Sequence, residues 1–100
     1  MKAIQVDTTR EDRPLLWQET AEPTFGPDEV LVAIQATALN RADLMQRAGN
    51  YPPPPGASDI MGLEMAGVIS QIGANVHGWQ VGDRVCALLP GGGYAEKVIV

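Results

Sequence analysis

GLEMAGVISQIG, residues Gly62–Gly73, decides the fold together with VGDRV, residues Val81–Val85, which follows after a short polar break. The β-branched residues of both segments favour the extended backbone of a strand. Gly67 and Gly73 permit bends or a close approach of another backbone segment, and Gly82-Asp83 supplies a turn. The two segments are therefore predicted to form two β-strands joined as a hairpin.

The segments on either side of this hairpin predict a mainly β domain, because strand-like runs alternate with clusters of Gly, Pro, Asn and Asp. The predicted strands cover Lys2–Val6, Leu15–Thr20, Glu29–Ala38, Glu64–Ile72, Arg84–Leu89 and Tyr94–Val100. Arg41–Ala48 is the only predicted helix, since it has good helix formers and is followed by Gly49, which suits a helix end. Asn50–Gly56 contains four consecutive prolines and is predicted to be extended and stiff.

Length and composition predict one soluble domain over residues 1–100. The chain has 7 basic and 12 acidic residues and a net charge of −5, which disfavours nucleic acid and anionic membranes as partners. Cys86 is the only cysteine and cannot form an intrachain disulfide, and the N-terminus has no apolar signal segment. The longest hydrophobic run, Val30–Ile34, is far shorter than the roughly 20 residues of a membrane-spanning helix. A reducing, cytoplasmic location is expected.

Two further motifs carry a resemblance to a known family. ALNRADLMQR, residues Ala38–Arg47, precedes the hairpin, and GGYAE, residues Gly92–Glu96, follows it. Together with the hairpin, these motifs closely resemble the N-terminal catalytic domain of the medium-chain dehydrogenase/reductase superfamily. The branch that they resemble most is the zinc-free NADPH:quinone oxidoreductases. The resemblance covers essentially the whole chain and implies a GroES-like, partly open β-barrel with one short helix.

The resemblance also implies a domain that this chain lacks. Members of the superfamily hold the dinucleotide mainly in a Rossmann domain, whose mark is a strand followed by G-x-G-x-x-G and a helix. No such sequence occurs here, and Gly91–Gly93 follows Pro90 and precedes a predicted strand. We therefore expect the chain to be a fragment of an NADPH-dependent enzyme that is inactive by itself.

No metal site is expected. In the zinc-dependent alcohol dehydrogenases that share this fold, a cysteine stands at the position of Asn40 and a histidine at that of Leu63. Leucine cannot bind a metal, and a lone carboxamide oxygen is a poor ligand for Zn²⁺. A single cysteine also cannot form a four-ligand structural site. Hydride transfer to a quinone does not require zinc, because the acceptor is already electron-poor.

Asn40 and Tyr51 are the candidate catalytic residues that the resemblance implies. The Asn40 NH₂ group can donate to a substrate carbonyl or to the nicotinamide amide, and Tyr51 can stack on a quinone and donate its hydroxyl. Both residues also have a structural interpretation. Asn40 can cap the following helix, which is compatible with a cleft role, and Tyr51 can anchor its loop against the prolines.

Asn40 and Arg41 are the candidate cofactor-binding residues. The resemblance places Arg41 near the cofactor pyrophosphate, which a guanidinium suits. The alternative is an Arg41 that is solvated or paired with a carboxylate such as Glu64. Asp43 and Glu64 are expected to form structural ion pairs with arginines more readily than a general acid/base pair. Cys86 is expected to be a small core residue.

The predicted function is the substrate-side domain of an NADPH-dependent quinone oxidoreductase. An enoyl-thioester reductase of the same superfamily, which also lacks zinc, is an alternative. A non-catalytic co-chaperonin subunit is a second alternative, because fold does not determine function. The short helix and stiff proline segment, in place of a mobile loop, favour the enzymes. The strand-like end Tyr94–Val100 is expected to leave an unpaired edge through which the chain self-associates.

Overall fold

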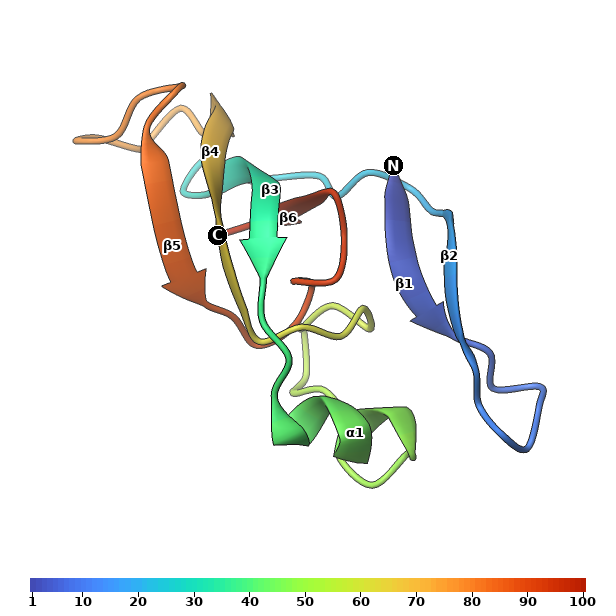
Figure 1. Ribbon diagram of the computed structural model, residues 1–100. Helices are drawn as coiled ribbons and strands as arrows, with labels where there is room; N and C mark the ends of the chain where they lie inside the picture. The colour runs from blue at the N-terminus through green and yellow to red at the C-terminus, as the bar shows by residue number, and fades with distance from the viewer.

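The computed structural model describes all residues of the chain, Met1–Val100. The elements occur in the order β1 (Lys2–Val6), β2 (Leu15–Glu19), β3 (Val30–Thr37), α1 (Arg41–Arg47), β4 (Glu64–Ile72), β5 (Arg84–Leu88) and β6 (Lys97–Ile99). Figure 1 shows the β1–β2 hairpin standing apart from the other four strands, with α1 below both. The molecule is elongated, with principal extents of 45 × 23 × 23 Å.

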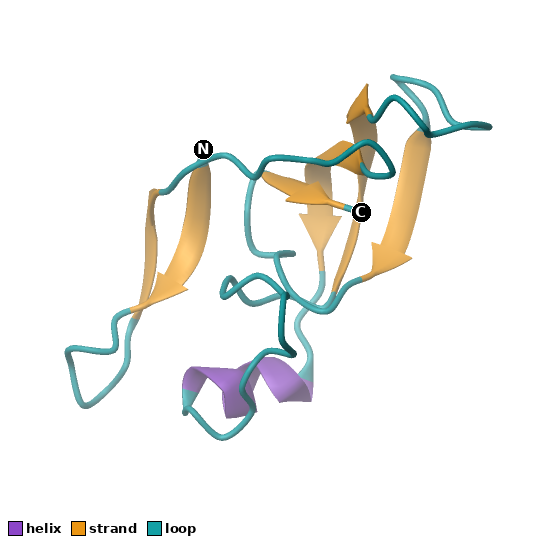
Figure 2. Cartoon of the chain, turned by 180° about the vertical axis from the view of Figure 1, so that it is seen from behind, coloured by secondary structure: helices purple, strands orange, loops and turns teal.

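The strands form two antiparallel sheets that do not close into a complete barrel. One sheet has four strands in the order β5-β4-β3-β6, and the other consists of β1 and β2. Figure 2 shows the same two groups from behind. An isolated bridge between Ala3 and Ala95 joins them, and the Ile4 N–H donates to the Tyr94 carbonyl at 2.8 Å. The mainly β, partly open barrel with one short helix is thus confirmed.

The core lies on one face of the four-stranded sheet. Its buried side chains come from three strands and from the segment after β5; they are Val32, Met65, Ile69, Leu89 and Val98. In β4 the burial alternates, with Met65, Gly67 and Ile69 buried and the residues between them more exposed. This alternation follows from the two-residue period of a strand, which sends successive side chains to opposite faces. The hairpin that the sequence predicts is formed by β4 and β5, and β4 contributes Met65 and Ile69 to the core.

The predicted boundaries agree with the observed ones to within one residue for five strands and the helix. The last strand is shorter than predicted, since β6 begins at Lys97. Gly93 and Tyr94 pair instead with a loop, donating their N–H groups to the carbonyls of Gly62 and Met61 at 3.0 and 2.9 Å. Gly93 and Tyr94 therefore contact the loop before β4 and do not pair with β3.

Two other sequence predictions need correction. Cys86 is exposed and is not a core residue, because it points to the outer face of β5 between the inward-facing Val85 and Ala87. The proline segment is not extended throughout: the Ala57 N–H donates to the Pro54 carbonyl at 3.0 Å, and Gly56 has a φ of 82°. Proline favours such a turn as much as it favours polyproline II, and a glycine at positive φ completes it.

The only helix, α1, is 7 residues long, so no helix of this chain is long enough to cross a membrane.

Gly62, in the loop that precedes β4, lies against the backbone of Gly93 and Tyr94. Its φ is 107°, and a Cβ atom placed on it would lie 2.6 Å from the Gly93 Cα and from the Tyr94 nitrogen. Only glycine satisfies both the conformation and the contact. This contact brings the Gly92–Glu96 motif beside the start of β4.

Replacing Gly62 by alanine is expected to destabilise the fold more than the same change at Gly56. Both residues have positive φ, which costs about 1–2 kcal/mol for alanine, but Gly56 has no atom within 4 Å of the added Cβ. Overpacking at Gly62 adds about 1–3 kcal/mol. Urea unfolding followed by tryptophan fluorescence measures the difference. Equal losses in the two variants would contradict the close-contact argument.

Candidate functional site

The site is built around the first turn of α1, where Asn40 is the residue that caps the helix. Its backbone is extended, with φ −127° and ψ 153°, and its N–H donates to the Asp43 Oδ2 at 2.8 Å. The Asp43 N–H in turn donates to the Asn40 carbonyl at 3.0 Å. A carboxylate in the first turn satisfies a free donor and complements the positive end of the helix. These contacts explain why the helix begins at Arg41.

The Asn40 side chain is turned toward β4. Its Nδ2 atom donates to the Glu64 Oε2 at 3.1 Å. The NH₂ group has two N–H donors and the side chain also has a carbonyl acceptor. One donor is used by Glu64. The other donor remains for a ligand.

Tyr94 and Asp43 form a buried pair behind the Asn40 cap. Their exposed fractions are 8% and 5%, and the Tyr94 hydroxyl donates to the Asp43 Oδ2. Burial raises the pKa of the Tyr94 hydroxyl well above its ordinary value, and the hydrogen bond to Asp43 and the charge of that carboxylate raise it further. Asp43 Oδ2 therefore holds both the helix start and the segment before β6. The Asp43 Oδ1 is buried and has no hydrogen-bond partner.

Sequence reasoning missed the role of Tyr94. The residue belongs to the Gly92–Glu96 motif, but its partner Asp43 lies 51 positions earlier. Proximity between such distant positions is not visible in the spacing of either motif. The only available signal was the general rule that a buried tyrosine hydroxyl finds a hydrogen-bond partner.

The expected ion pairs between arginines and the carboxylates at 43 and 64 are not formed. Asp43 bonds to Tyr94 and to the Asn40 backbone, and Glu64 bonds to Asn40. Arg41 is exposed and forms no ion pair, so of its two structural alternatives the solvated one is observed and the pairing with Glu64 is not. Residues two apart in a helix, such as Arg41 and Asp43, point to different faces, and the Glu64 carboxylate accepts from Asn40 instead.

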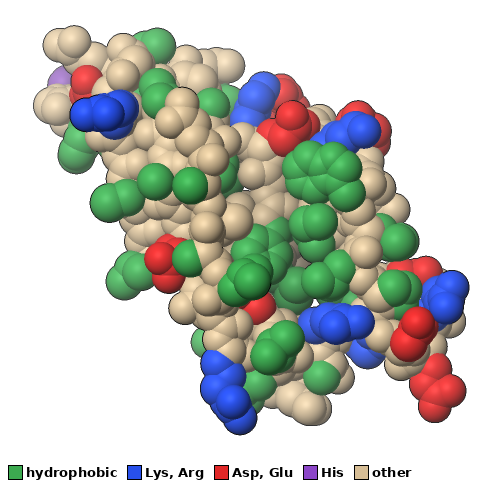
Figure 3. Space-filling model, in the orientation of Figure 1, with side chains coloured by type: hydrophobic (Ala, Val, Ile, Leu, Met, Phe, Trp, Pro, Cys, Tyr) green, Lys and Arg blue, Asp and Glu red, His purple; other side chains and the backbone are tan.

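Asn40 and Arg41 line the same cavity, which has a volume of about 340 Å³. Asp43 and Tyr94 also line it, and Leu15, Leu39, Leu44, Arg47 and Met61 complete it. A larger cavity of about 490 Å³ adjoins it, since Leu15, Leu39 and Tyr94 line both. We call the two together the apolar groove. Figure 3 shows hydrophobic side chains gathered over this face, between the β1–β2 hairpin and the four-stranded sheet.

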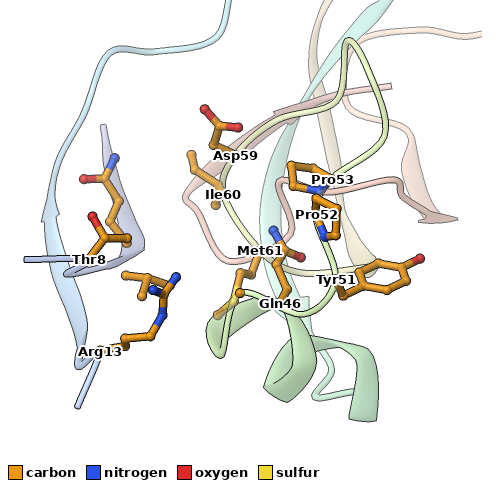
Figure 4. Close-up of a pocket in the computed structure, with 12 residues that line it drawn as sticks. Thr8, Arg13, Gln46, Tyr51, Pro52, Pro53, Asp59, Ile60 and Met61 are labelled. Atoms are coloured by element: carbon orange, nitrogen blue, oxygen red, sulfur yellow. The ribbon is translucent and has the colours of Figure 1, made fainter. Parts of the chain in front are cut away.

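Tyr51 lies in a different cavity, of about 380 Å³. Figure 4 shows this cavity between Thr8 and Arg13 of the hairpin on one side and the segment from Asp59 to Met61 on the other, with the Tyr51 ring pointing away from Arg13. Met61 lines this cavity and also the one that holds Asn40. The structure therefore does not bring Asn40 and Tyr51 into one cavity. Met61 separates them, with an exposed fraction of 2%.

The charged side chains of the site do not form a metal-ligand set. No three His, Cys, Asp or Glu side chains lie close enough together to hold a metal ion. Leu63, which stands where the zinc-dependent enzymes have a histidine, offers no atom that can bind a metal. The Glu64 carboxylate accepts a hydrogen bond from Asn40. The side chains present therefore do not fit zinc.

Replacing Tyr94 by phenylalanine is expected to destabilise the fold and to change its pH dependence. The bond to Asp43 contributes about 1.5–3 kcal/mol. Above about pH 10 the unfolded chain releases the Tyr94 proton while the folded chain keeps it. The free energy of unfolding of the wild type then falls by up to about 1.4 kcal/mol per pH unit.

Urea unfolding between pH 7 and pH 11 measures this effect as the difference between wild type and Tyr94→Phe. The difference is expected to be constant below about pH 10 and to shrink above it. A difference that does not change with pH would show that the folded state does not retain the Tyr94 proton.

Known proteins are similar to this chain in sequence and in fold. The model of the alcohol dehydrogenase GroES-like domain family matches residues 26–100. Acryloyl-coenzyme A reductase of Sulfurisphaera tokodaii is 38% identical over 89 residues, which cover 89% of this chain and 26% of that protein. The quinone oxidoreductase of Pseudomonas syringae pv. Tomato DC3000 superposes with a TM-score of 0.83 and 34% identity, over 99% of this chain and 30% of that one.

The quinone oxidoreductase of Escherichia coli, solved in complex with NADPH, also superposes with a TM-score of 0.83. Its identity is 26%, over 100% of this chain and 31% of that one. The chain thus spans about a quarter to a third of the length of these proteins. The match over residues 26–100, with the fold and the motifs around Asn40 and Gly62, leads to one conclusion: the chain belongs to the alcohol dehydrogenase GroES-like domain family, within the medium-chain dehydrogenase/reductase superfamily.

Proposed function

We propose that residues 1–100 form the substrate-side domain of an NADPH-dependent quinone oxidoreductase. The observation that carries the proposal is the anchored carboxamide of Asn40, which keeps a free N–H donor at the edge of the apolar groove. A flat, apolar acceptor with carbonyl oxygens suits a groove with these walls and few polar groups. The similarity to two quinone oxidoreductases, one solved with NADPH, supports the same assignment.

The chemistry assigned to this chain is the stabilisation of negative charge on oxygen. NADPH supplies the hydride when it is bound. As the quinone ring receives it, negative charge develops on a carbonyl oxygen, and the second Asn40 N–H can donate to that oxygen or hold the nicotinamide amide. The exposed side chains of Leu15 and Leu39 supply apolar surface against which the substrate ring can pack.

Arg41 and Tyr51 have supporting parts in the proposal. Arg41 is exposed and unpaired, so its guanidinium is free to bind the pyrophosphate of the cofactor, which a second, nucleotide-binding domain would mainly hold. Tyr51 is 41% exposed in the neighbouring cavity, and we assign its hydroxyl as a donor to a part of the substrate that extends past Met61. No zinc takes part in this proposal, because the side chains present do not fit it.

Reduction of an enoyl thioester is a second candidate function. It is favoured by one observation, the 38% identity to acryloyl-coenzyme A reductase. A thioester carbonyl also gains negative charge when hydride adds to the conjugated double bond, so the same Asn40 donor would serve it. Parallel assays with a benzoquinone and with acryloyl-coenzyme A distinguish the two substrates.

In the complete enzyme that carries this domain, Asn40→Ala is expected to lower kcat with quinones. Removing one donor to developing charge costs on the order of 10²–10³ in rate at a strong oxyanion site, and a smaller factor is expected where the charge is delocalised over a quinone. Tyr51→Phe, which removes only the hydroxyl, is expected to have a smaller effect in the same direction.

Asn50→Ala is the matched control, because Asn50 is exposed at the other end of α1 and only its backbone N–H is bonded, to Met45. Steady-state kinetics and circular dichroism of the three variants test the assignment. Unchanged kcat and KM in both Asn40→Ala and Tyr51→Phe would assign these residues to structure alone.

We also propose that this chain self-associates through β6. The strand is at the edge of its sheet, since β3 is its only neighbour in the order β5-β4-β3-β6. Val30 and Val100 exchange two backbone hydrogen bonds of 2.9 Å. In an antiparallel pair the next residue, Ile99, then points its N–H and carbonyl to the open side. Such an edge can pair with a second chain.

Size-exclusion chromatography with light scattering tests the proposal at micromolar concentration, where dimers or larger species are expected. Val100→Lys is expected to shift the chain toward monomer, because an edge lysine disfavours pairing. Val81→Lys makes the same change at another exposed valine, in the turn before β5, and is expected to have no effect. A strictly monomeric wild type would overturn the proposal.

A further inference from the structure

Asn40 is held at two different atoms by two different carboxylates. Asp43 accepts a hydrogen bond from its backbone N–H at 2.8 Å, and Glu64 accepts one from its side-chain Nδ2 at 3.1 Å. The first contact fixes where the residue sits, because it belongs to the helix start. The second contact fixes how the side chain is turned. Only the second bears on which atoms a ligand meets.

A carboxylate is a strict selector of carboxamide orientation. A carboxamide can present either its NH₂ group or its oxygen to a neighbour, and the two ends have nearly the same shape. An ionised carboxylate only accepts hydrogen bonds, so Glu64 stabilises the orientation that directs Nδ2 toward it and disfavours the reverse. Without Glu64, no carboxylate would hold Nδ2 in this direction.

Glu64 is itself well placed for this task. It is the first residue of β4, where it pairs with Leu88 of β5, and its carbonyl accepts a hydrogen bond from the Thr37 hydroxyl at 2.8 Å. The adjacent Leu63 carbonyl accepts from the Leu89 N–H at 2.7 Å. No lysine or arginine forms an ion pair with the Glu64 carboxylate. Its acceptor atoms are therefore available to Asn40, on a strand and not on a loop.

We infer that Glu64 is a positioning residue, which fixes the orientation of the Asn40 carboxamide so that one N–H is directed to the ligand. This inference rests on the proposed function of Asn40 and deepens it. Glu64 transfers no proton and contacts no reacting atom in this role. Its contribution is to keep the donor oriented before the substrate arrives, which removes the cost of turning it during the reaction.

The first experiment follows the contact itself. Nuclear magnetic resonance of residues 1–100 reports the temperature dependence of the Asn40 Nδ2 proton shifts. In the wild type a small temperature dependence is expected for the hydrogen-bonded proton. The other Nδ2 proton is expected to show a larger dependence. Glu64→Ala is expected to abolish this difference between the two protons. Glu64→Gln is expected to retain part of it, because the glutamine carbonyl also accepts a hydrogen bond. Glu11→Ala removes an exposed charge with no contact to the site and is the matched control.

The second experiment is a double-mutant cycle in the complete enzyme. Glu64→Ala is expected to lower kcat about as much as Asn40→Ala does, with KM less affected, and Glu64→Gln to recover part of the loss. In the Asn40→Ala background, Glu64→Ala is expected to cause no further loss, because it then has nothing to orient.

The outcomes separate the two proposals. If Asn40→Ala lowers kcat and the Glu64→Ala loss multiplies with it in the double variant, the inference about Glu64 is overturned while the function of Asn40 stands. If Asn40→Ala leaves reduction of quinones and enoyl thioesters unchanged, the proposed function is overturned. The resonance experiment then decides by itself whether Glu64 orients the carboxamide, and unchanged Asn40 shifts in Glu64→Ala would show that it does not.

Discussion

The buried carboxylate of Asp43 is the contact on which the rest of this structure depends. Its Oδ2 atom accepts hydrogen bonds from the Asn40 backbone and from the Tyr94 hydroxyl, which lie far apart in the sequence. A buried charge is costly unless it is hydrogen-bonded, so the carboxylate requires both donors to be in place. The start of α1 and the segment before β6 are therefore fixed relative to each other.

The glycines around β4 make this arrangement sterically possible. Gly62 lets the Gly92–Glu96 motif approach at the distance of backbone contact, and this approach brings Tyr94 to Asp43. The same approach places the face of the apolar groove beside Asn40. A polar anchor behind and apolar walls in front give a site with a single well-held donor. That combination suits an acceptor that is mostly apolar and carries a carbonyl oxygen.

The charged side chains around Asn40 are held by hydrogen bonds or face solvent, and they do not form ion pairs with one another. The two carboxylates nearest to Asn40 both accept from it or its neighbours, and the arginine beside it faces solvent. A site held by hydrogen bonds to Asp43 and Glu64 keeps Arg41 free. In an ion-paired arrangement, the same guanidinium would be neutralised within the domain. The geometry thus separates the residues that hold the site from the one that is open to a ligand.

The sequence by itself determined the strands, the helix and the family, because these depend on local patterns. β-branched alternation marks a strand wherever it occurs, and Asn40, Asp43 and Gly49 mark the limits of α1 within ten residues of one another. The motifs around Gly62 and Asn40 carry the family resemblance for the same reason. Only the tertiary structure decided the partners of Asp43 and Glu64, the outward position of Cys86, and the separation of Asn40 from Tyr51 by Met61. Those features depend on which segments, distant in the sequence, come into contact. The backbone contact at Gly62 and the register of β4 and β5 determine these contacts.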